Sequence, residues 1–351
     1  MSFVTPPPLE RGDRIAVVAP SSGAAAEVPH VYERGLQRLR EVFDLEPVEF
    51  PTTTKDSEYL AAHPEERARD IEEAVSDPEI RGVVATIGGD DQVRILKYLD
   101  PDVLREHPTR FFGYSDSTNL ALYLWNLGIV SYQGPAVMVQ LAMGGGIHEY
   151  TVEGVERAFF EESIGSVEPA ERFTDETLDW ANPANLERAP EIEDSPGWRW
   201  HDPADSGPVT GRLWGGCLEI ISMQLMAGRY LPDPARLDGA VLFFETSEEL
   251  RAASWVKEVL LSMGERGLLE RFDAVLVGRA KTRTHRENPP LEERAAHRSR
   301  QRETIREVLE IYNLEIPVVF EFDCGHTDPI VPVPIGAEAT VDPREERIVF
   351  H

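Results

Sequence analysis

Lysine is scarce in this chain of 351 residues, and positive charge is scarce with it. Four lysines stand among 35 basic residues, against 63 aspartates and glutamates, which leaves a net charge of −28. Nucleic acids and anionic membrane surfaces bind proteins through positive charge, so neither is an expected partner. Acid-rich composition keeps proteins soluble in concentrated salt, and we expect a halophilic source, although many acidic proteins work in ordinary salt.

Cysteines and long apolar runs are also few. Cys217 and Cys324 cannot form a disulfide framework or a zinc cluster, and their apolar surroundings predict buried free thiols. No run of apolar residues approaches the length of a membrane span. The first residues lack the basic and apolar regions of a signal peptide. We therefore expect a soluble, cytoplasmic protein.

Short apolar runs alternate with helical patterns in the first half of the chain. Expected strands at 14–20, 47–50, 81–87 and 129–132 are separated by helices, which predicts a parallel, doubly wound α/β sheet. Functional loops of such sheets follow the carboxyl ends of strands. Ser21, Gly89 and Ser115 all occupy that position. We assign residues 1–167 to this N-terminal α/β domain.

The pattern breaks down over residues 168–208, which are acidic and rich in proline, asparagine and glycine. We interpret this stretch as a connecting segment. It carries Trp180, Trp198 and Trp200, which either pin the segment down or form a stacking surface for a ligand. Residues 209–351 form the expected second, β-rich domain, with strands at 239–245, 274–277 and 318–322, helices at 247–263 and 291–312, and two short final runs joined by a turn.

A serine stands at a strand-to-helix corner in FFGYSDST, residues 111–118. Asp116 or Ser117 can cap the helix that follows, which is the commoner use of such residues. Alternatively, the turn is a nucleophile elbow that exposes the Ser115 hydroxyl above the sheet edge. A serine nucleophile also needs a base and a group that orients the base.

Two further residues at strand ends have the types that such a site requires. His326 follows the apolar run PVVFEFDCG, and Glu245 closes the run GAVLFFE. A carboxylate is costly at the end of a buried strand unless it has a partner, although Glu245 could also be an acid at a helix N-terminus. The chain order Ser115, Glu245, His326 is nucleophile, acid, base, an order found in unrelated hydrolases. Spacing alone leaves chance open as an explanation.

Short motifs in the same order along almost the whole chain resemble the LD-carboxypeptidase serine peptidases, including the microcin C self-immunity type. The resemblance implies a Ser-Glu-His triad at Ser115, Glu245 and His326. It also implies an N-terminal Rossmann-like domain, a C-terminal domain of barrel-like β character, an active site between them and a homodimer. The motifs are GDRIAVVAPSS (12–22), ERARDIEEAVSDPEIRGVVATIGGDD (66–91), FFGYSDST (111–118), GRLWGGCL (211–218), VLFFE (241–245), VLVGR (275–279) and FDCGHTDP (322–329).

In the mechanism that follows, His326 takes the proton of Ser115, Glu245 holds the imidazole, and an acyl-enzyme forms and is hydrolysed. The oxyanion needs fixed N–H donors, and we expect the backbone N–H groups of Asp116 and Gly89 to supply them. The alternative for Gly88-Gly89 is a tight turn without a chemical role. No metal or organic cofactor is expected.

The substrate remains open between two branches of the family. A murein tetrapeptide LD-carboxypeptidase releases terminal D-alanine and needs a cation for the substrate carboxylate, for which Arg279 is a candidate, unless it forms an internal salt bridge. A self-immunity homologue cleaves an aminoacyl nucleotide and stacks its base on tryptophan. The motifs GGDD and FDCGHTDP and the tryptophans of the connecting segment favour the second branch.

Two alternatives come from other classes of protein. IGGDD resembles the phosphate loop of NAD kinase and phosphofructokinase-like enzymes, in which the aspartate helps to bind magnesium. That resemblance leaves Ser115, Glu245 and His326 unexplained. A non-catalytic binding protein that keeps the fold is the second alternative, and the intact triad argues against it.

Overall fold

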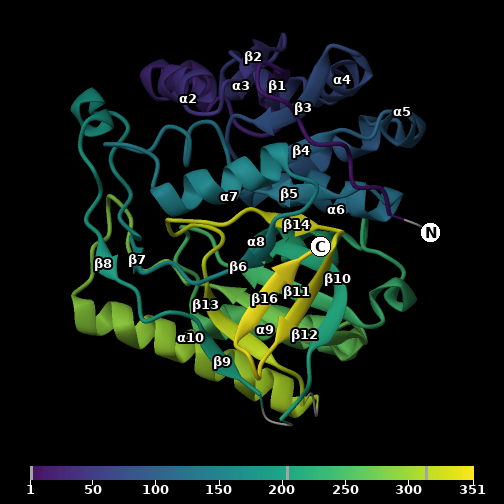
Figure 1. Ribbon diagram of the computed structural model, residues 1–351, viewed down its shortest axis with the longest axis vertical. Coiled ribbons are helices and arrows are strands. Elements are labelled where there is room, and N and C mark those ends of the chain that lie inside the picture. The colour runs from purple at the N-terminus through teal and green to yellow at the C-terminus, as the bar shows by residue number, and fades with distance from the viewer. Residues whose placement is uncertain (1–2, 203–204, 313–314) are drawn as a thin grey trace. The chain divides into compact units, whose positions relative to one another are not determined.

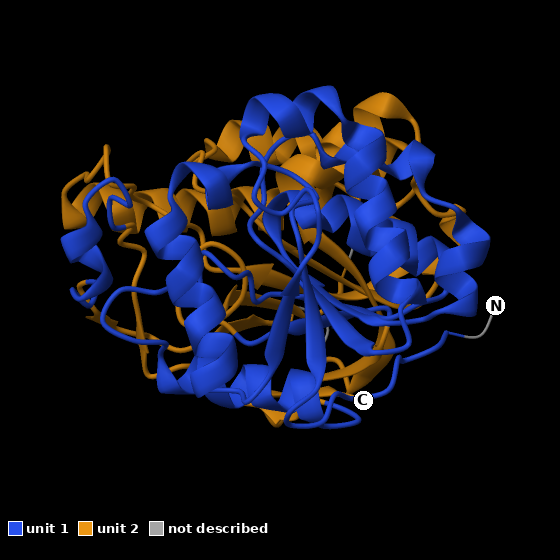
Figure 2. Cartoon of the chain, turned by 90° about the horizontal axis from the view of Figure 1, so that it is seen from above, with its two compact units in different colours: residues 1–163, 178–190, 331–336 blue, residues 164–177, 191–330, 337–351 orange. Residues whose placement is uncertain are grey.

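The computed structural model describes residues 3–202, 205–312 and 315–351. The chain divides into two compact units that are each built from several stretches (Figure 2). Unit 1 comprises residues 1–163, 178–190 and 331–336, and unit 2 comprises residues 164–177, 191–330 and 337–351. None of the helices in the described part of the chain is long and apolar enough to cross a membrane.

Unit 1 contains a six-stranded sheet with the order β14-β5-β4-β3-β1-β2 (Figure 1). Five strands are parallel, and β14 runs antiparallel to β5 at the edge. The predicted parallel α/β sheet is therefore confirmed. The strands are β1 (Arg14–Val18), β2 (Glu46–Glu49), β3 (Ile80–Ala85), β4 (Arg110–Gly113), β5 (Ser131–Gln133) and β14 (Val333–Ile335).

The burial of the central strands shows that this sheet is covered on both faces. All four residues of β4 are buried, as are the last four of β3 and of β1, so neither set of alternating side chains meets solvent. The helices of this unit are α1 (Ala24–Glu27), α2 (Pro29–Glu41), α3 (Ser57–Ala62), α4 (Pro64–Ser76), α5 (Pro101–Glu106), α6 (Thr118–Leu127) and α7 (Glu149–Phe160), with 3-10 turns at Gln92–Arg94, Leu96–Tyr98, Ser115–Ser117 and Pro183–Leu186.

Local sequence fixes several helix ends in unit 1. Pro64 opens α4 with two glutamates in the first turn, where an acidic side chain favours the helix dipole. Gly128 ends α6 in the left-handed conformation, which glycine adopts without strain. The stretch before Leu99 forms two short 3-10 turns. One of them is fixed by a hydrogen bond from the Gln92 N–H to Asp116, a tertiary contact that helical periodicity cannot reveal.

Unit 2 contains an eight-stranded mixed sheet with the order β6-β16-β15-β10-β11-β12-β13-β9. Its four central strands, β10 to β13, are parallel, and the others are antiparallel to their neighbours. The strands are β6 (Gly165–Val167), β9 (Arg199–His201), β10 (Val209–Cys217), β11 (Ala240–Glu245), β12 (Phe272–Gly278), β13 (Val318–Phe322), β15 (Glu338–Asp342) and β16 (Arg347–Phe350), with a separate pair β7 (Arg172–Phe173) and β8 (Glu193–Asp194).

The helices of unit 2 are α8 (Leu218–Ala227), α9 (Ala253–Glu265) and α10 (Leu291–Ile311), with 3-10 turns at Pro234–Leu237 and Leu269–Arg271. The helix predicted at 247–263 thus begins six residues late. Ser247 is held by Glu219, which accepts hydrogen bonds from its backbone N–H at 3.1 Å and its hydroxyl at 2.8 Å. Leu250 has φ of +49°, which no helix accommodates.

The segment interpreted as a connector, residues 168–208, is divided between the two units. Residues 178–190 pack on unit 1, where Arg34 pairs with Glu187 at 2.6 Å and the His30 ring lies 2.9 Å from the carbonyl oxygen of Trp180. The described residues on either side belong to unit 2. The segment therefore differs from a free linker, because each part is folded onto a unit.

Candidate active site

Three loops of unit 1 follow the carboxyl ends of neighbouring strands β1, β3 and β4, and they carry Ser21, Gly89 and Ser115. In the strand order 2-1-3-4-5, β2 lies on one side of β1 and the later strands lie on the other side. The order in which the chain adds strands therefore reverses between β1 and β3. Ligands of open α/β sheets bind at the carboxyl ends of strands beside such a reversal. The topology thus places the three loops predicted from the sequence at the edge of the sheet where ligands of such folds bind.

Ser115 is the first residue of the turn between β4 and α6. Its φ is +59°, in the left-handed region. Adopting this region costs a residue other than glycine about 1–3 kcal/mol. It is also partly exposed within a stretch of buried neighbours. A Cβ atom on Gly88 would lie 2.8 Å from the Ser115 Cβ and 3.0 Å from its hydroxyl oxygen. Gly88, which the sequence interpretation passed over in favour of Gly89, therefore makes room for the serine.

Asp116 is fully buried directly after this serine, and its carboxylate organises the neighbouring loop. One oxygen accepts hydrogen bonds from the backbone N–H groups of Asp91 (3.1 Å) and Gln92 (2.9 Å), and the other accepts from the Asn119 amide (2.8 Å). Burial raises the pKa of Asp116 to about 6, although these hydrogen bonds act in the opposite direction. The side chain therefore links the serine turn to the Gly88-Gly89 loop.

Asp91, the last residue of the Gly-Gly-Asp-Asp motif, is also held in place. The buried Arg67 guanidinium donates to Asp91 at 2.7 Å and to the Ser21 carbonyl oxygen at 2.8 Å, and Arg94 pairs with Asp91 at 2.9 Å. Through Arg67, Asp91 ties the loop after β3 to the loop after β1.

Glu245 ends β11 in unit 2 and is almost completely buried. Two glycines leave space for it. A Cβ atom on Gly278 would lie 2.5 Å from the Glu245 Cβ, and one on Gly325 would lie 2.4 Å from its Cγ. Gly325 also has φ of +91°, which lets the chain turn back toward the carboxylate.

His326 contacts this carboxylate. Its Nδ1 lies 2.6 Å from Glu245 Oε2, and its Nε2 lies 3.0 Å from Oε2 of Glu248, which the sequence interpretation missed. Lys281, also missed, donates from its buried amino group to the His326 carbonyl oxygen at 2.9 Å. The only signal for Glu248 was its position three residues after the strand-end Glu245.

The two carboxylates change the ionisation of the imidazole. Burial alone lowers the pKa of His326, but Glu245 and Glu248 outweigh it and raise the pKa to about 10. In turn, the imidazolium lowers the pKa of Glu248 to about 2 against the effect of partial burial. Of the three proposed catalytic residues, Glu245 and His326 therefore meet within unit 2, whereas Ser115 belongs to unit 1.

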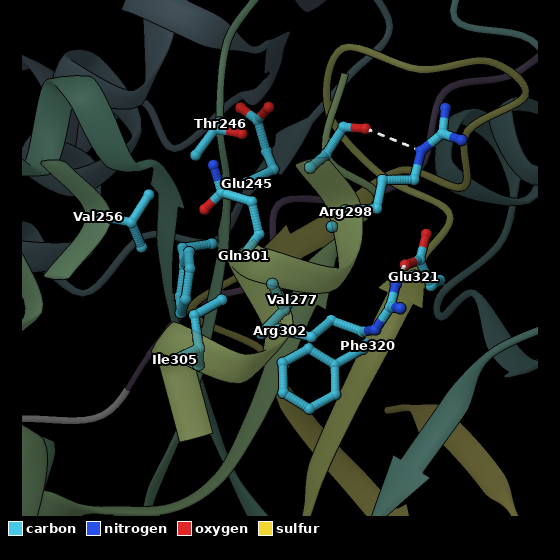
Figure 3. A pocket seen from close by; sticks show the side chains of 13 residues that line it. Glu245, Thr246, Val256, Val277, Arg298, Gln301, Arg302, Ile305, Phe320 and Glu321 are labelled. Atoms are coloured by element: carbon cyan, nitrogen blue, oxygen red, sulfur yellow. Dashed lines mark hydrogen bonds and ion pairs between the residues drawn. The ribbon is translucent and has the colours of Figure 1, made fainter. Parts of the chain in front are cut away.

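Glu245 is one of the residues that line a small cavity in unit 2 (Figure 3). It measures about 20 Å³, which is room for roughly one water molecule and far below the size of a ligand site. Arg298, Gln301 and Arg302 of α10 line it, and Arg302 pairs with Glu321 there. The cavity is therefore too small to be a substrate pocket.

Arg279 is 1% exposed and is engaged in buried ion pairs with Asp323 at 2.9 Å and Glu321 at 3.5 Å. Trp198 is 8% exposed, donates from its indole N–H to Asp323 at 2.9 Å, and packs on Phe322. These contacts favour the internal alternatives for both residues, a salt bridge and a pinning side chain.

Trp180 and Trp200 are half-buried. Trp200 lies on β9, opposite Val319 of β13, within unit 2. Trp180 belongs to the stretch of the connecting segment that packs on unit 1. These two tryptophans therefore keep part of their surface accessible, in contrast to Trp198.

A buried network that sequence analysis missed pins another part of the connecting segment. Asp175 accepts hydrogen bonds from Arg283, Arg294 and Arg298, each at 2.7 Å. Burial by itself raises the pKa of Asp175, but the hydrogen bond from Thr282 and the three cations lower it. The adjacent Thr174 forms a β-bridge with Asp328, two residues after His326. The network thus supports the loop that carries the histidine.

Both cysteines are buried and free, as predicted. Burial raises the pKa of each thiol well above its ordinary value, so both stay protonated. Cys217 lies beside Glu245 in the register of β10 and β11. Within residues 3–202, 205–312 and 315–351, no three His, Cys, Asp or Glu side chains are placed to hold a metal ion.

Several curated relatives match nearly the whole chain, and two of them represent different branches. The Microcin C7 self-immunity protein MccF of Escherichia coli is 26% identical over 339 residues, which are 95% of this chain and 92% of that protein. The Probable murein peptide carboxypeptidase of Bacillus subtilis is 26% identical over 350 residues, which are 98% of this chain and 93% of that protein. Both branches considered from the sequence are thus represented.

Solved structures share the fold over the same length. The MccF-like protein from Streptococcus pneumoniae in complex with AMP has a TM-score of 0.85 at 27% identity, covering 97% of this chain and 98% of that one. MccF in complex with glutamyl sulfamoyl guanosine has a TM-score of 0.84 at 25% identity, covering 98% and 97%.

Family comparison agrees with these likenesses. Residues 15–134 match the LD-carboxypeptidase N-terminal domain, and residues 210–341 match the LD-carboxypeptidase C-terminal domain. The two matches take in the Ser115 turn of unit 1 and the Glu245–His326 pair of unit 2. The chain belongs to the LD-carboxypeptidase family.

Proposed function

We propose that the protein is a serine hydrolase that cleaves an amide bond of a small peptide or aminoacyl nucleotide, with Ser115 as nucleophile, His326 as base and Glu245 as the group that orients the base. The observation that carries the serine type is the left-handed backbone of Ser115 in its turn against Gly88. Strained backbone of this kind concentrates at functional sites. A helix cap alone needs no such conformation.

Glu245 and His326 supply the acid–base part of the proposal. The 2.6 Å contact fixes a proton on Nδ1 and directs Nε2 as the nitrogen that accepts the serine proton. The proposal requires Nε2 to reach the Ser115 hydroxyl during the reaction. After attack on the amide carbonyl, the imidazolium returns its proton to the leaving amine, and water then hydrolyses the acyl-enzyme.

The oxyanion would be stabilised by backbone N–H groups of the Ser115 turn and the neighbouring loop, those of Asp116 and Gly89. Support comes from the close contact between Gly88 and Ser115. The Asp116 carboxylate also fixes that loop, since it accepts hydrogen bonds from the backbone N–H groups of Asp91 and Gln92. Donors fixed in this way cost no reorganisation when negative charge develops on the oxygen.

The aminoacyl-nucleotide substrate is favoured over the murein tetrapeptide. Two neighbours over the full length hold AMP and glutamyl sulfamoyl guanosine, respectively. Arg279, the expected cation for a tetrapeptide carboxylate, is buried in ion pairs. The murein reaction remains the second candidate because of the Bacillus subtilis relative.

A side-by-side hydrolysis assay tests the choice, with aminoacyl-sulfamoyl adenosine and an L,D-linked tetrapeptide as substrates. We expect faster cleavage of the nucleotide. Trp180→Ala or Trp200→Ala should then lower kcat/KM for the nucleotide about five- to hundredfold, since stacking on a base contributes about 1–3 kcal/mol. Trp198→Ala is the comparison variant, because replacing this buried side chain should lower the stability of the fold. Equal losses on both substrates would favour the murein or a general amidase reaction.

A further inference from the structure

His326 has a carboxylate on each ring nitrogen. Glu245 holds Nδ1 at 2.6 Å, and Glu248 holds Nε2 at 3.0 Å. The proposed mechanism commits Nδ1 to Glu245, so Nε2 is the nitrogen left to take the serine proton. In the structure, that nitrogen is already engaged by Glu248.

The charge state has the same consequence. With two carboxylates in contact, the pKa of His326 is about 10, so the ring is an imidazolium at neutral pH. An imidazolium has no lone pair and cannot accept a proton. The base step therefore requires Glu248 to leave Nε2, whereas the Glu245 contact persists.

Glu248 and Glu245 differ in how firmly they are held. The Glu245 side chain is 0% exposed, and the Glu248 side chain is 58% exposed. Glu248 lies in the loop between β11 and α9, next to Ser247, which is anchored by two hydrogen bonds to Glu219. A rotation of the Glu248 side chain can therefore free Nε2 without moving the backbone.

Of the neighbouring cations, Lys281 acts on the Glu248 charge only at longer range, and Arg251 pairs with other glutamates. The buried Lys281 amino group donates to the His326 carbonyl oxygen, and burial lowers its pKa although Asp328, Asp175 and Glu248 raise it. Arg251 lies 3.6 Å from Glu219 and 4.0 Å from Glu249. A cation that draws Glu248 away has therefore to come from outside these pairs.

We infer that Glu248 is a specificity-determining latch, whose carboxylate holds His326 at rest and releases it when a cationic group of the substrate, close to the scissile amide, takes the carboxylate as its partner. The inference rests on the proposed function. It names amides with an ammonium group next to the cleaved bond, such as a free α-amino group. On release, the imidazolium loses its Nε2 proton to water and keeps its Nδ1 proton toward Glu245.

The latch can be tested without any substrate, by NMR titration of the His326 ring in the full chain. Glu248→Gln removes one charge and keeps the shape, so the pKa of His326 should fall by about 1–3, the effect of a single close opposite charge. Glu249→Gln, the adjacent exposed glutamate, is the matched control and should leave the titration unchanged. The same titration in wild type and Glu248→Gln would overturn the latch.

The substrate part is tested with pairs of amides that differ only in a free or N-acetylated α-amino group. Wild type and Glu249→Gln should prefer the free amine in kcat/KM by about tenfold or more, as expected for a close charge pair. In Glu248→Gln the preference should fall toward one, because the acetylated amide gains while the free amine loses. An unchanged preference would overturn the assignment. If wild type cleaves no amide at all, the proposed function fails and takes the substrate part with it, while the titration still decides the latch.

Discussion

Ser115 combines a left-handed backbone with a place at the end of a buried parallel strand. An alanine there keeps the same strain and loses only the hydroxyl. Ser115→Ala should therefore lower kcat by about 1000-fold or more while the unfolding temperature stays within about 2 °C. Ser262→Ala, an exposed serine on α9, is the control. Activity close to wild type would remove Ser115 from the mechanism.

Strain at Ser115 can also be measured directly. Glycine accepts positive φ freely, and an L-residue there costs about 1–2 kcal/mol. Replacement by glycine removes this cost and so stabilises the folded state. Part of the gain in stability is offset by the extra conformational freedom of glycine in the unfolded chain. Ser115→Gly should therefore be inactive and yet more stable than Ser115→Ala, by up to about 1 kcal/mol in urea unfolding. A glycine variant less stable than the alanine variant would contradict stored strain.

Asp116 gives a pH dependence whose sign is opposite to that of a salt-bridged carboxylate. Its folded pKa is raised to about 6, so its stabilising contribution is present below the unfolded value and is lost as pH rises through about 6. Wild type should thus gain about 1 kcal/mol relative to Asp116→Asn when pH falls from 7.5 to 5. Urea unfolding at both pH values measures this difference. A pH-independent difference between the two proteins would contradict it.

At the scale of elements, the loop after β3 has to approach the Ser115 turn closely. A methyl group on Gly88 would contact the Ser115 Cβ and hydroxyl at 2.8 and 3.0 Å. Gly88→Ala should therefore lower kcat/KM by about a hundredfold, the effect of a small displacement of reacting groups. Gly207→Ala adds its methyl group to open space and should behave as wild type. Equal activity of the two variants would separate this loop from catalysis.

Elements with strong periodicity were predictable from the sequence, and those fixed by distant contacts were not. The strand at 318–322 lies where its apolar run placed it, and the long helix begins at Leu291 as expected. The late start of α9 depends on Glu219, which lies 28 residues from Ser247. Strand β14 was missed because its short run pairs with β5, about 200 residues earlier, and carries no period of its own.

The candidate site follows the same division. Residue types at strand ends indicated Ser115, Glu245 and His326, and the Glu245–His326 contact is present in the structure. The second carboxylate on His326 was hidden because Glu248 was expected in a helix. Arg279 was an attractive substrate cation from its place after β12, but its partners Asp323 and Glu321 are distant in sequence.

At the scale of the whole molecule, the net charge of −28 sets the response to salt. Mutual repulsion destabilises a compact chain, and ions screen it within about 10 Å at 0.1 M and about 3 Å at 1 M. The unfolding temperature should therefore rise by about 5 °C or more between dilute buffer and molar potassium chloride, a gain of roughly 1–2 kcal/mol. Sucrose of equal osmolality is the control. An unfolding temperature that stays flat or falls with salt would contradict the halophilic interpretation. It would not affect the proposed enzymatic function.

Chain connectivity has a consequence for synthesis. The chain passes between the units several times, and unit 1 receives its edge strand β14 only at residues 333–335. N-terminal domains commonly fold first as they leave the ribosome, but here β5 stays an open edge until residues 333–335 have been made. Exposed strand edges invite pairing with other chains. Newly made protein should thus depend on chaperones until β14 emerges, and a fragment ending before β14 should aggregate where residues 1–351 fold.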